Sequence, residues 1–370
     1  MKITALKTHA VHVNHRGDWT FLAVHTDEGI TGYGEVNPGG ARSGSVDFLQ
    51  QVEPVLAGRD PGAIERILAE LLPSPVDRSK VMALSALDQA LWDIKGKVLG
   101  VPVADVIGGR CRDEIPLYAN INRATTERTP AGFARNAAAA VADGFDAVKL
   151  APFDGMPAGI DRASDAREGI ACMEAVRAAI GPDVSLLIDC HSHFTARGGC
   201  EVFDALRDLD LYWYEEPVPD EDHEGYRAIK DHIDVPLAGG ESLMYREGFW
   251  PVLDQGLMDV IMPDVTIVGG LWELKKVAAM AEGRGVPTAP HGPFGPLTIA
   301  AGVQAMAAHP GFQILEYAWG EVPWRHELIE PPERIQGGRI RVSDRPGLGV
   351  SLNMEAIETH RADRDRKAVP

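Results

Sequence analysis

The segment SLLIDCHSHFTARGGCEVFDALRDLDLYWYEEP (185–217) contains a short apolar run, a helix-length stretch, and a second apolar run that ends on acidic residues. This order predicts a strand, a covering helix and a parallel strand. The same rhythm extends in both directions from about residue 113 onward. The apolar runs are IPLYAN (115–120), AVKLAP (147–152), SLLIDC (185–190), WYEEP (213–217), PLAGGES (236–242), DVIMPD (259–264), VPTAPH (286–291) and QILEY (313–317).

Eight apolar runs joined by helical stretches favour a closed β/α-barrel over an open doubly wound sheet. The crossovers include TPAGFARNAAAAVADG and LWELKKVAAMAEGRG, both with helical spacing of apolar residues. No GxGxxG motif opens a helix after the first run, which weakens the case for a dinucleotide-binding sheet. We therefore predict an α/β barrel over residues 113–336.

The segments on either side of the barrel form a different pattern. Residues 1–60 alternate as strands and turns, in ITALKTHAVHV (3–13), TFLAVHTDEG (20–29) and ITGYGEV (30–36). From 61 to 108 the spacing becomes helical, and Gly100 closes the longest helix. We predict an α+β capping domain over residues 1–112, and a C-terminal segment, 337–370, that returns to it.

Composition restricts the class of partner. The chain has 370 residues, 45% of them hydrophobic, and a net charge of −18. This charge disfavours nucleic acid or an anionic membrane as the main partner. Four cysteines without CxxC spacing indicate reduced thiols and a cytoplasmic location. We expect no signal peptide, because the N-terminus lacks an apolar core, and no membrane span, because no apolar run reaches about 18 residues.

Ionisable residues stand at the ends of the predicted strands. In a barrel, side chains at the carboxyl ends of the strands converge on the active site. One such residue could be an ordinary solvated charge, but every strand from the second to the eighth ends on one, which packing alone would not select. The residues are Lys149, Asp189 with His191, Glu215, Glu241, Asp264, His291 and Glu316.

Three of these residues suit a metal ion. Asp189, Glu215 and Glu241 follow neighbouring strands at intervals of 26 residues. Carboxylate oxygens are the ligands that Mg²⁺ prefers, whereas zinc more often takes histidine or cysteine. Without a cation, the three carboxylates would repel one another. We predict one Mg²⁺ per subunit.

The chain resembles the enolase superfamily in its mandelate racemase subgroup, over essentially its whole length. The motifs that carry the likeness are SALDQALWDIKGKVLGVPVADVIGG (85–109), AVKL, LIDCH, WYEEPV, LAGGES, IMPDVTIVGG, APHGPFGP (289–296) and PGLGV (346–350). The resemblance implies a modified (β/α)₇β TIM-like barrel with an α+β capping domain. It also implies a small-molecule substrate and a homo-oligomer, from dimer to octamer.

Within this subgroup the chain is most like D-galactonate dehydratase-type acid sugar dehydratases. Racemases usually carry Lys-x-Lys after the second strand, but here Lys149 is followed by Leu150 and Ala151. The seventh strand ends on His291, which the resemblance pairs with Asp264. On a strand, residues i and i+2 face the same side, so His191 should face the site with Asp189.

The implied reaction is loss of water from a sugar acid, through an enediolate, to a 2-keto-3-deoxy acid. His291, helped by Asp264, would remove the C2 proton, and His191 would protonate the departing C3 hydroxyl. Lys149 and a protonated Glu316 would hydrogen-bond the enediolate. The segments LLPSPVDRSKVM (71–82) and YAWGEVPWRHELIEPPE (317–333) differ from the dehydratase pattern. The substrate is therefore only a class: an aldonate such as D-galactonate, or a related aldonate or aldarate.

Two other functions remain open. A racemase, epimerase or cycloisomerase would use the same metal site, with His191 as the second proton-transfer group. A non-enzymatic binding protein would bind the acid without exchanging its C2 proton. Substrate contacts are also open, because the candidates could equally be ordinary surface or packing residues. These candidates are His15, Arg16, Trp19, Arg42, His193 and Trp319.

Overall fold

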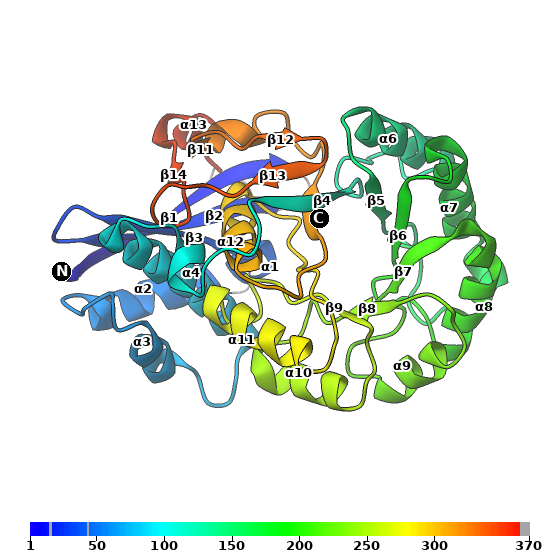
Figure 1. Ribbon diagram of the computed structural model, residues 1–370, viewed down its shortest axis with the longest axis horizontal. Helices are drawn as coiled ribbons and strands as arrows, with labels where there is room; N and C mark the ends of the chain where they lie inside the picture. The colour runs from blue at the N-terminus through cyan, green and yellow to red at the C-terminus, as the bar shows by residue number, and fades with distance from the viewer. Residues whose placement is uncertain (15–16, 43, 363–370) are drawn as a thin grey trace.

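The computed structural model describes residues 1–14, 17–42 and 44–362, apart from the side chain of Arg42. Figure 1 shows a ring of strands and helices on one side and a cap of strands and helices on the other. The red C-terminal segment lies over the blue N-terminal strands rather than over the far side of the ring. The N-terminal strands and the described part of the C-terminal segment therefore both contribute to the capped side of the molecule.

The cap begins with a three-stranded antiparallel sheet: β1 (Ile3–Asn14), β2 (Gly17–Thr26) and β3 (Thr31–Val36). The expected strands are present, but the prediction of strands and turns up to residue 60 was wrong. Helices α1 (Pro38–Arg42) and α2 (Ser45–Leu56) lie in the second half of residues 1–60. In α2, Leu49, Val52 and Leu56 recur at helical spacing and are buried, and this periodicity outweighs the Pro within the helix.

Three further helices complete the cap: α3 (Ile64–Leu71), α4 (Arg78–Leu99) and α5 (Val103–Val106). The Asp77 side chain accepts the N–H of Lys80 at the start of α4, and Gly100 ends the helix in the left-handed conformation. Helix α4 lies directly on β3 because Gly34 has no side chain. A Cβ there would come within 2.1 Å of the Ala86 carbonyl oxygen.

The barrel strands are parallel and run in chain order around the ring. They are β4 (Glu114–Asn120), β5 (Ala147–Leu150), β6 (Ser185–Asp189), β7 (Leu211–Glu215), β8 (Leu237–Gly239), β9 (Val260–Ile261) and β10 (Leu315–Ala318). Because β10 pairs with β4, the ring closes and the expected barrel is confirmed. The seventh run, VPTAPH, is not a strand. It pairs only through Thr288, which bridges Ile261 and Phe312.

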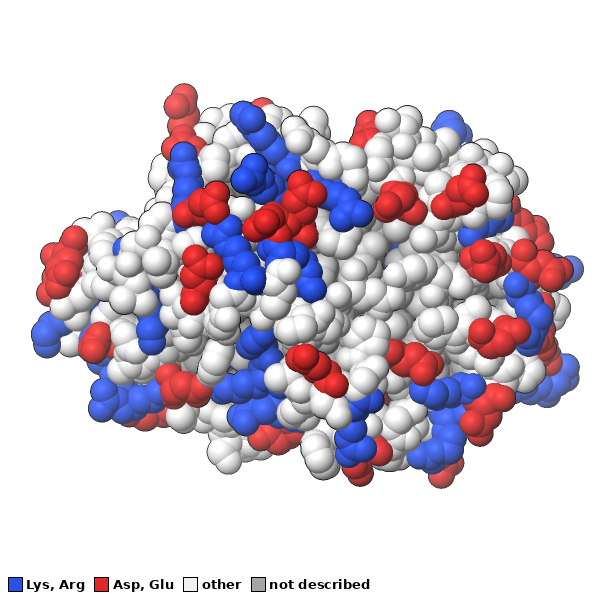
Figure 2. Space-filling view, viewed as in Figure 1, with Lys and Arg blue, Asp and Glu red and all other residues white. Residues whose placement is uncertain are grey.

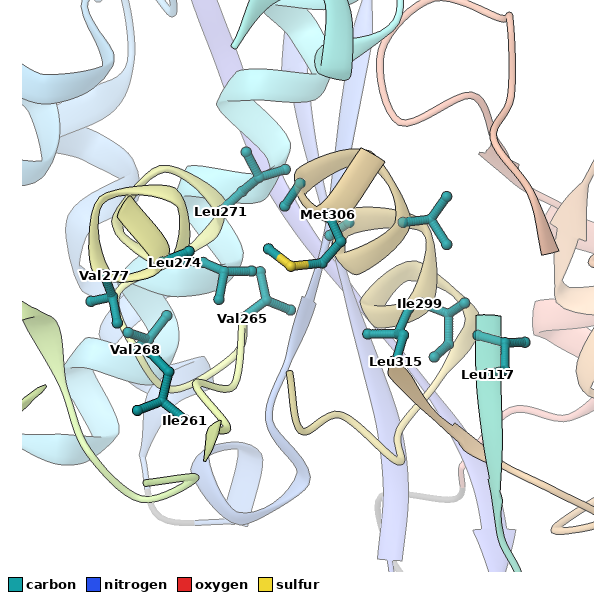
Figure 3. Packing of buried hydrophobic residues seen from close by; sticks show 14 of the residues in the cluster. Leu117, Ile261, Val265, Val268, Leu271, Leu274, Val277, Ile299, Met306 and Leu315 are labelled. Carbon is teal, nitrogen blue, oxygen red and sulfur yellow. The ribbon is translucent and has the colours of Figure 1, made fainter. Parts of the chain in front are cut away.

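Seven helices cover the outside of the ring: α6 (Pro130–Ala142), α7 (Arg167–Ile180), α8 (Ala196–Leu206), α9 (His223–Lys230), α10 (Tyr245–Asp254), α11 (Leu271–Glu282) and α12 (Pro296–Ala307). Figure 3 shows Leu274 and Val277 of α11 near Val265 and Val268, which follow β9. It also shows Ile299 of α12 near Leu315 of β10. This packing belongs to one apolar core that continues into the cap.

A second apolar cluster fills the inside of the barrel. Most of its residues precede a predicted site residue by two positions, so the same face of each run turns from apolar to ionisable at the rim. These residues are Ala147, Leu187, Trp213, Met262, Ala289 and Ile314, and Tyr118 of the same cluster precedes Asn120 in the same way. The site therefore rests on a packed apolar floor.

The C-terminal segment joins both parts of the fold. Strand β13 (Arg339–Arg341) pairs with β12 (Ile335–Gln336) and with barrel strand β4. Strand β14 (Ser351–Leu352) pairs with β11 (Ile329–Glu330), and α13 (Met354–Thr359) contacts β1. The segment thus contacts the cap and also extends the barrel sheet, and the division into domains stays a prediction.

On the face of the molecule that Figure 2 shows, charges of both signs are mixed. In Figure 2, acidic and basic side chains lie beside one another over the cap and the ring on the face shown. Among the helices that the structure describes, none is long and apolar enough to cross a lipid bilayer.

Candidate active site

Three carboxylates meet at the carboxyl ends of neighbouring strands. Asp189 ends β6, Glu215 ends β7, and Glu241 follows β8 by two residues. One oxygen from each lies within 4.8 Å of the others. Asp189 and Glu215 are almost fully buried, and Glu241 Oε2 has no hydrogen-bond partner among the described residues. Three converging carboxylates, two of them buried and one with an unsatisfied oxygen, fit a hard divalent cation.

The pKa of Glu215 reflects the repulsion among these carboxylates. Trp213 Nε1 donates to Glu215 Oε2 at 2.8 Å, and Lys149 Nζ donates to Oε1 at 2.7 Å. Burial, together with repulsion from Asp189, nevertheless raises the pKa of Glu215 to about 8. A bound cation would remove this repulsion, so the residues present fit a metal.

Lys149 is the cation already built into the site. Its side chain is 1% exposed. Its ammonium lies 2.9 Å from Glu316 Oε1 and 3.6 Å from Asp189 Oδ2, in addition to Glu215. Burial opposes its charged form, but these carboxylates outweigh burial and raise the pKa of Lys149. These contacts therefore stabilise the charged ammonium of Lys149.

His291 and Asp264 form a buried pair, as the resemblance implied. The imidazole Nδ1 lies 2.7 Å from Asp264 Oδ2. Its Nε2 points the other way, 3.3 Å from Glu241 Oε2 and 3.7 Å from Glu316 Oε2. Burial lowers the pKa of His291, but the nearby carboxylates, Glu241 first, raise it to about 10. Nε2 is thus the nitrogen presented to the carboxylate cluster.

Glu316 is an acceptor in this arrangement. Its Oε1 accepts from Lys149 and from Asn120 Nδ2 at 2.7 Å, and its Oε2 accepts the N–H of Gly292 at 3.0 Å. Burial raises its pKa, but Lys149 and His291 outweigh burial and lower the pKa to about 2. Three donors thus stabilise the ionised form in this arrangement, and a protonated, donating Glu316 stays a prediction.

His191 reaches the cluster by a different route from the one expected. Strand β6 ends at Asp189, and His191 has a left-handed backbone with φ 43°, so strand parity does not place it. A turn brings its Nε2 to 2.9 Å from Asp189 Oδ2. Burial opposes its charged form, but Asp189 and Asp154 outweigh burial and raise the pKa of His191.

Asp154 is the main site residue that the sequence did not reveal. It hydrogen-bonds His191 Nδ1, so His191 also has a carboxylate partner. Asn122 Nδ2 donates to Asp154 at 3.1 Å, and Arg128 lies 3.3 Å away. Asp154 follows β5 in an irregular turn, where no periodicity marks it. Asn120, by contrast, ends the first apolar run, and the strand-end rule could have found it.

The proposed substrate contacts give a mixed result. His15 and Arg16 lie outside the described residues, as does the Arg42 side chain. The Trp19 ring is buried against Trp324, with Arg325 over its face.

The other two candidates contact the protein itself. His193 Nδ1 lies 3.0 Å from the carbonyl oxygens of Cys190 and His191. Trp319 Nε1 donates to Asp143 Oδ2, just beyond α6, at 2.8 Å. Substrate contact by these residues stays a prediction.

Comparison with family models matches both parts of the chain. Residues 3–108 match the description "Mandelate racemase / muconate lactonizing enzyme, N-terminal domain", and residues 132–356 match "Enolase C-terminal domain-like".

Similar proteins match over nearly the whole chain. A D-xylonate dehydratase of Haloferax volcanii is 32% identical, over 97% of this chain and 89% of the relative. A D-galactonate dehydratase of Variovorax paradoxus is 35% identical, over 96% and 94%. A D-galactarolactone cycloisomerase of Agrobacterium fabrum is 32% identical, over 98% and 99%. The crystal structure of an enolase-superfamily member from Salmonella Typhimurium has a TM-score of 0.88 at 28% identity, covering 96% and 97%.

Proposed function

Because the chain belongs to the mandelate racemase / muconate lactonizing enzyme family of the enolase superfamily, we propose that it is a hydro-lyase that removes water from a sugar acid. The substrate is an aldonate such as D-galactonate, or a related aldonate or aldarate, and the product is a 2-keto-3-deoxy acid. Relatives named as dehydratases of D-xylonate and D-galactonate support this substrate class.

The observation that carries the proposal is the presence of two histidine–carboxylate pairs across the barrel. His191 follows the third strand and His291 ends the seventh run, so the two positions face each other in a ring of eight. The carboxylate cluster and Lys149 lie between them in the ring order. An elimination needs one group to take a proton and another to give one to the leaving group, and two separate histidines meet that need.

A cation at Glu241 would offset the carboxylate that raises the pKa of His291 most, so that Nε2 would be unprotonated before the reaction. His291 Nε2 then takes the C2 proton of the substrate, while Asp264 accepts from Nδ1. The electrons of the C–H bond move into the carboxylate and form an enediolate, while the Lys149 ammonium donates to a carboxylate oxygen. Collapse of the enediolate breaks the bond from C3 to its hydroxyl, and a proton from His191 turns the departing group into water. The enol that remains tautomerises to the keto acid.

Asp189, Glu215 and Glu241 would hold one Mg²⁺ ion. When bound, this ion supplies a Lewis acid that polarises the substrate carboxylate and lowers the barrier to removal of the C2 proton.

A second candidate function is isomerisation through the same intermediate. Two histidines across the barrel also suit proton removal on one side and return on the other, and a cycloisomerase is among the relatives. Ala151 stands where racemases of this type carry a second lysine. The alanine favours dehydration over racemisation, because it removes the lysine that racemases use for the second proton transfer. His191 alone would then have to return the proton.

A screen of sugar acids tests the proposal. Purified protein with Mg²⁺ is incubated with D-galactonate, D-gluconate, D-xylonate and galactarate, and keto acid is measured with a carbonyl reagent. We expect keto acid from at least one, and none from His291→Asn protein. An epimer or lactone without keto acid would instead establish the isomerase, and no reaction with any acid would remove both.

A further inference from the structure

A continuous line of hydrogen bonds joins the cap to the buried histidine pair. Asn37, directly after β3, donates from Nδ2 to Thr266 Oγ1 at 2.9 Å. The Thr266 hydroxyl donates to Asp264 Oδ1 at 2.7 Å, and the Thr266 N–H donates to the same oxygen at 2.6 Å. Asp264 Oδ2 then accepts from His291 Nδ1. Every residue in the line is at most 8% exposed.

The direction of this line is fixed by the groups that compose it. Asn37 Oδ1 accepts the N–H of Gly39 at 2.8 Å, so its amide nitrogen must face Thr266. A hydroxyl has one hydrogen, and Thr266 uses it toward Asp264, so its oxygen is free to accept from Asn37. Two donors thereby occupy Asp264 Oδ1, which leaves Oδ2 for His291.

The same cap strand also supports the other side of the histidine. Glu35 lies near the end of β3, two residues before Asn37. Its Oε1 accepts the N–H of Gly295 at 2.6 Å, and its Oε2 accepts the N–H of Thr298 at 2.9 Å. These donors begin α12, four and seven residues after His291. The end of β3 thus holds both the segment after His291 and the partner of its imidazole.

We propose that Asn37 and Thr266 are positioning residues for proton transfer, through which the cap fixes the orientation of the Asp264 carboxylate and hence of His291. This inference rests on the proposed function, because it concerns the group that removes the C2 proton. Neither residue touches the reacting atoms. Their effect is geometric: with Oδ1 held, the carboxylate cannot rotate away from Nδ1, and Nε2 keeps its aim at the carboxylate cluster.

The activity test compares Thr266→Val with Thr266→Ser, using whichever acid of the screen turns over fastest. Valine keeps the size and the backbone N–H but removes the hydroxyl, whereas serine keeps it. Loss of hydrogen bonds that orient a site residue typically costs about 10–100-fold in activity. We expect kcat to fall by about this factor in Thr266→Val with KM changed less than about threefold, and Thr266→Ser to restore it. Asn37→Ala should show a smaller fall of the same kind.

Ser85→Ala is the matched control. Ser85 Oγ accepts the N–H of Gly269 at 3.1 Å, another buried contact between α4 of the cap and the barrel, without a link to His291. If the Thr266 hydroxyl were only structural, Thr266→Val and Ser85→Ala would both lower thermal stability. Their kcat values, calculated per folded enzyme, would then be the same. Equal kcat values in Thr266→Val and Ser85→Ala would overturn the proposal.

A second readout does not depend on turnover. Proton NMR of the Mg²⁺-loaded protein should show a low-field signal for His291 Nδ1–H, assigned by its absence in His291→Asn. We expect the signal in the wild type and Thr266→Ser, and its shift or loss in Thr266→Val. If the wild type dehydrates no acid, the proposed function fails, and this signal still decides the inference. An unchanged signal in Thr266→Val would refute it.

Discussion

The two histidine–carboxylate pairs of the site differ in how they are built. The His291–Asp264 pair is buried, and its carboxylate accepts from Thr266, which in turn accepts from Asn37 of the cap. The His191–Asp154 pair lies in turns after β6 and β5, and the His191 side chain is 31% exposed. The difference fits two tasks: a proton taken from carbon needs an accurately placed base, whereas a departing hydroxyl needs a donor within reach.

The largest expected effect breaks the buried pair. Asp264→Asn would turn one acceptor oxygen into an N–H donor while Thr266 still donates to the other, so His291 Nδ1 would lose its acceptor and its proton would move to Nε2. Removing a general base costs about 10²–10⁴-fold, and we expect kcat to fall within this range. Steady-state kinetics with the best acid of the screen checks this, and a loss of less than fivefold would show that the pair is not the base.

The response of the thermal midpoint to Mg²⁺ should distinguish the proposed ligand Asp189 from Asp154. At a concentration of about 100 times Kd, a bound ion stabilises the folded state by about 2.7 kcal/mol. We expect Mg²⁺ to raise the thermal midpoint of the wild type and of Asp154→Asn, but not of Asp189→Asn. Differential scanning fluorimetry with and without a chelator measures this. A normal Mg²⁺ response in Asp189→Asn would place the ion elsewhere.

The half-buried His191–Asp154 pair should tolerate the loss of its carboxylate better than the buried pair. Asp154→Asn keeps the volume and removes the charge beside His191 Nδ1, and we expect a loss of about 10–100-fold in keto acid formation. Removal of the C2 proton should persist, because His291 is untouched. The rate of C2 deuterium incorporation, followed by proton NMR, measures this step. A parallel loss of both would mean that Asp154 shapes the whole site.

The smallest effect concerns stability in acid. Burial raises the pKa of Asp154, but the hydrogen bond with His191 outweighs it and lowers the pKa to about 2 from an ordinary 3.8. A carboxylate with a lowered pKa stabilises the fold above about pH 4, and this contribution is lost as the pH falls toward 2. Discounted for partial exposure, it amounts to about 1–2 kcal/mol. Urea titrations at pH 5 and 3 should show that the free energy of unfolding falls less in Asp154→Asn than in the wild type. An identical fall in the two proteins would contradict this.

The same difference explains what the sequence could predict. Asp189, Glu215 and His291 were identified as site candidates because an apolar run followed by an ionisable residue marks the rim of a barrel. Asp154 and Thr266 lie in turns beyond strand ends, where the side-chain direction depends on local backbone angles that no periodicity encodes. Asn37 acts across the contact between cap and barrel, so its partner is fixed only by tertiary packing.

In the fold, the pattern was least informative where strands are short. The barrel order followed from the repeated runs, but the run that ends at His291 pairs only through Thr288. Helix α2 was not predicted, because residues 1–60 were assigned as strands and turns from the alternation in their first half. The first difference arose where pairing with neighbouring strands decides the conformation, and the second where a helical period inside a strand-rich region was overlooked.

Deuterium incorporation at C2 and keto acid formation, measured together in His291→Asn and His191→Asn, test the central claim most directly. The account predicts neither activity in His291→Asn, because the C2 proton is not removed. It predicts C2 incorporation with little keto acid in His191→Asn, because the proton is removed but the hydroxyl does not leave. Incorporation retained in His291→Asn, or keto acid formed at the wild-type rate by His191→Asn, would contradict it.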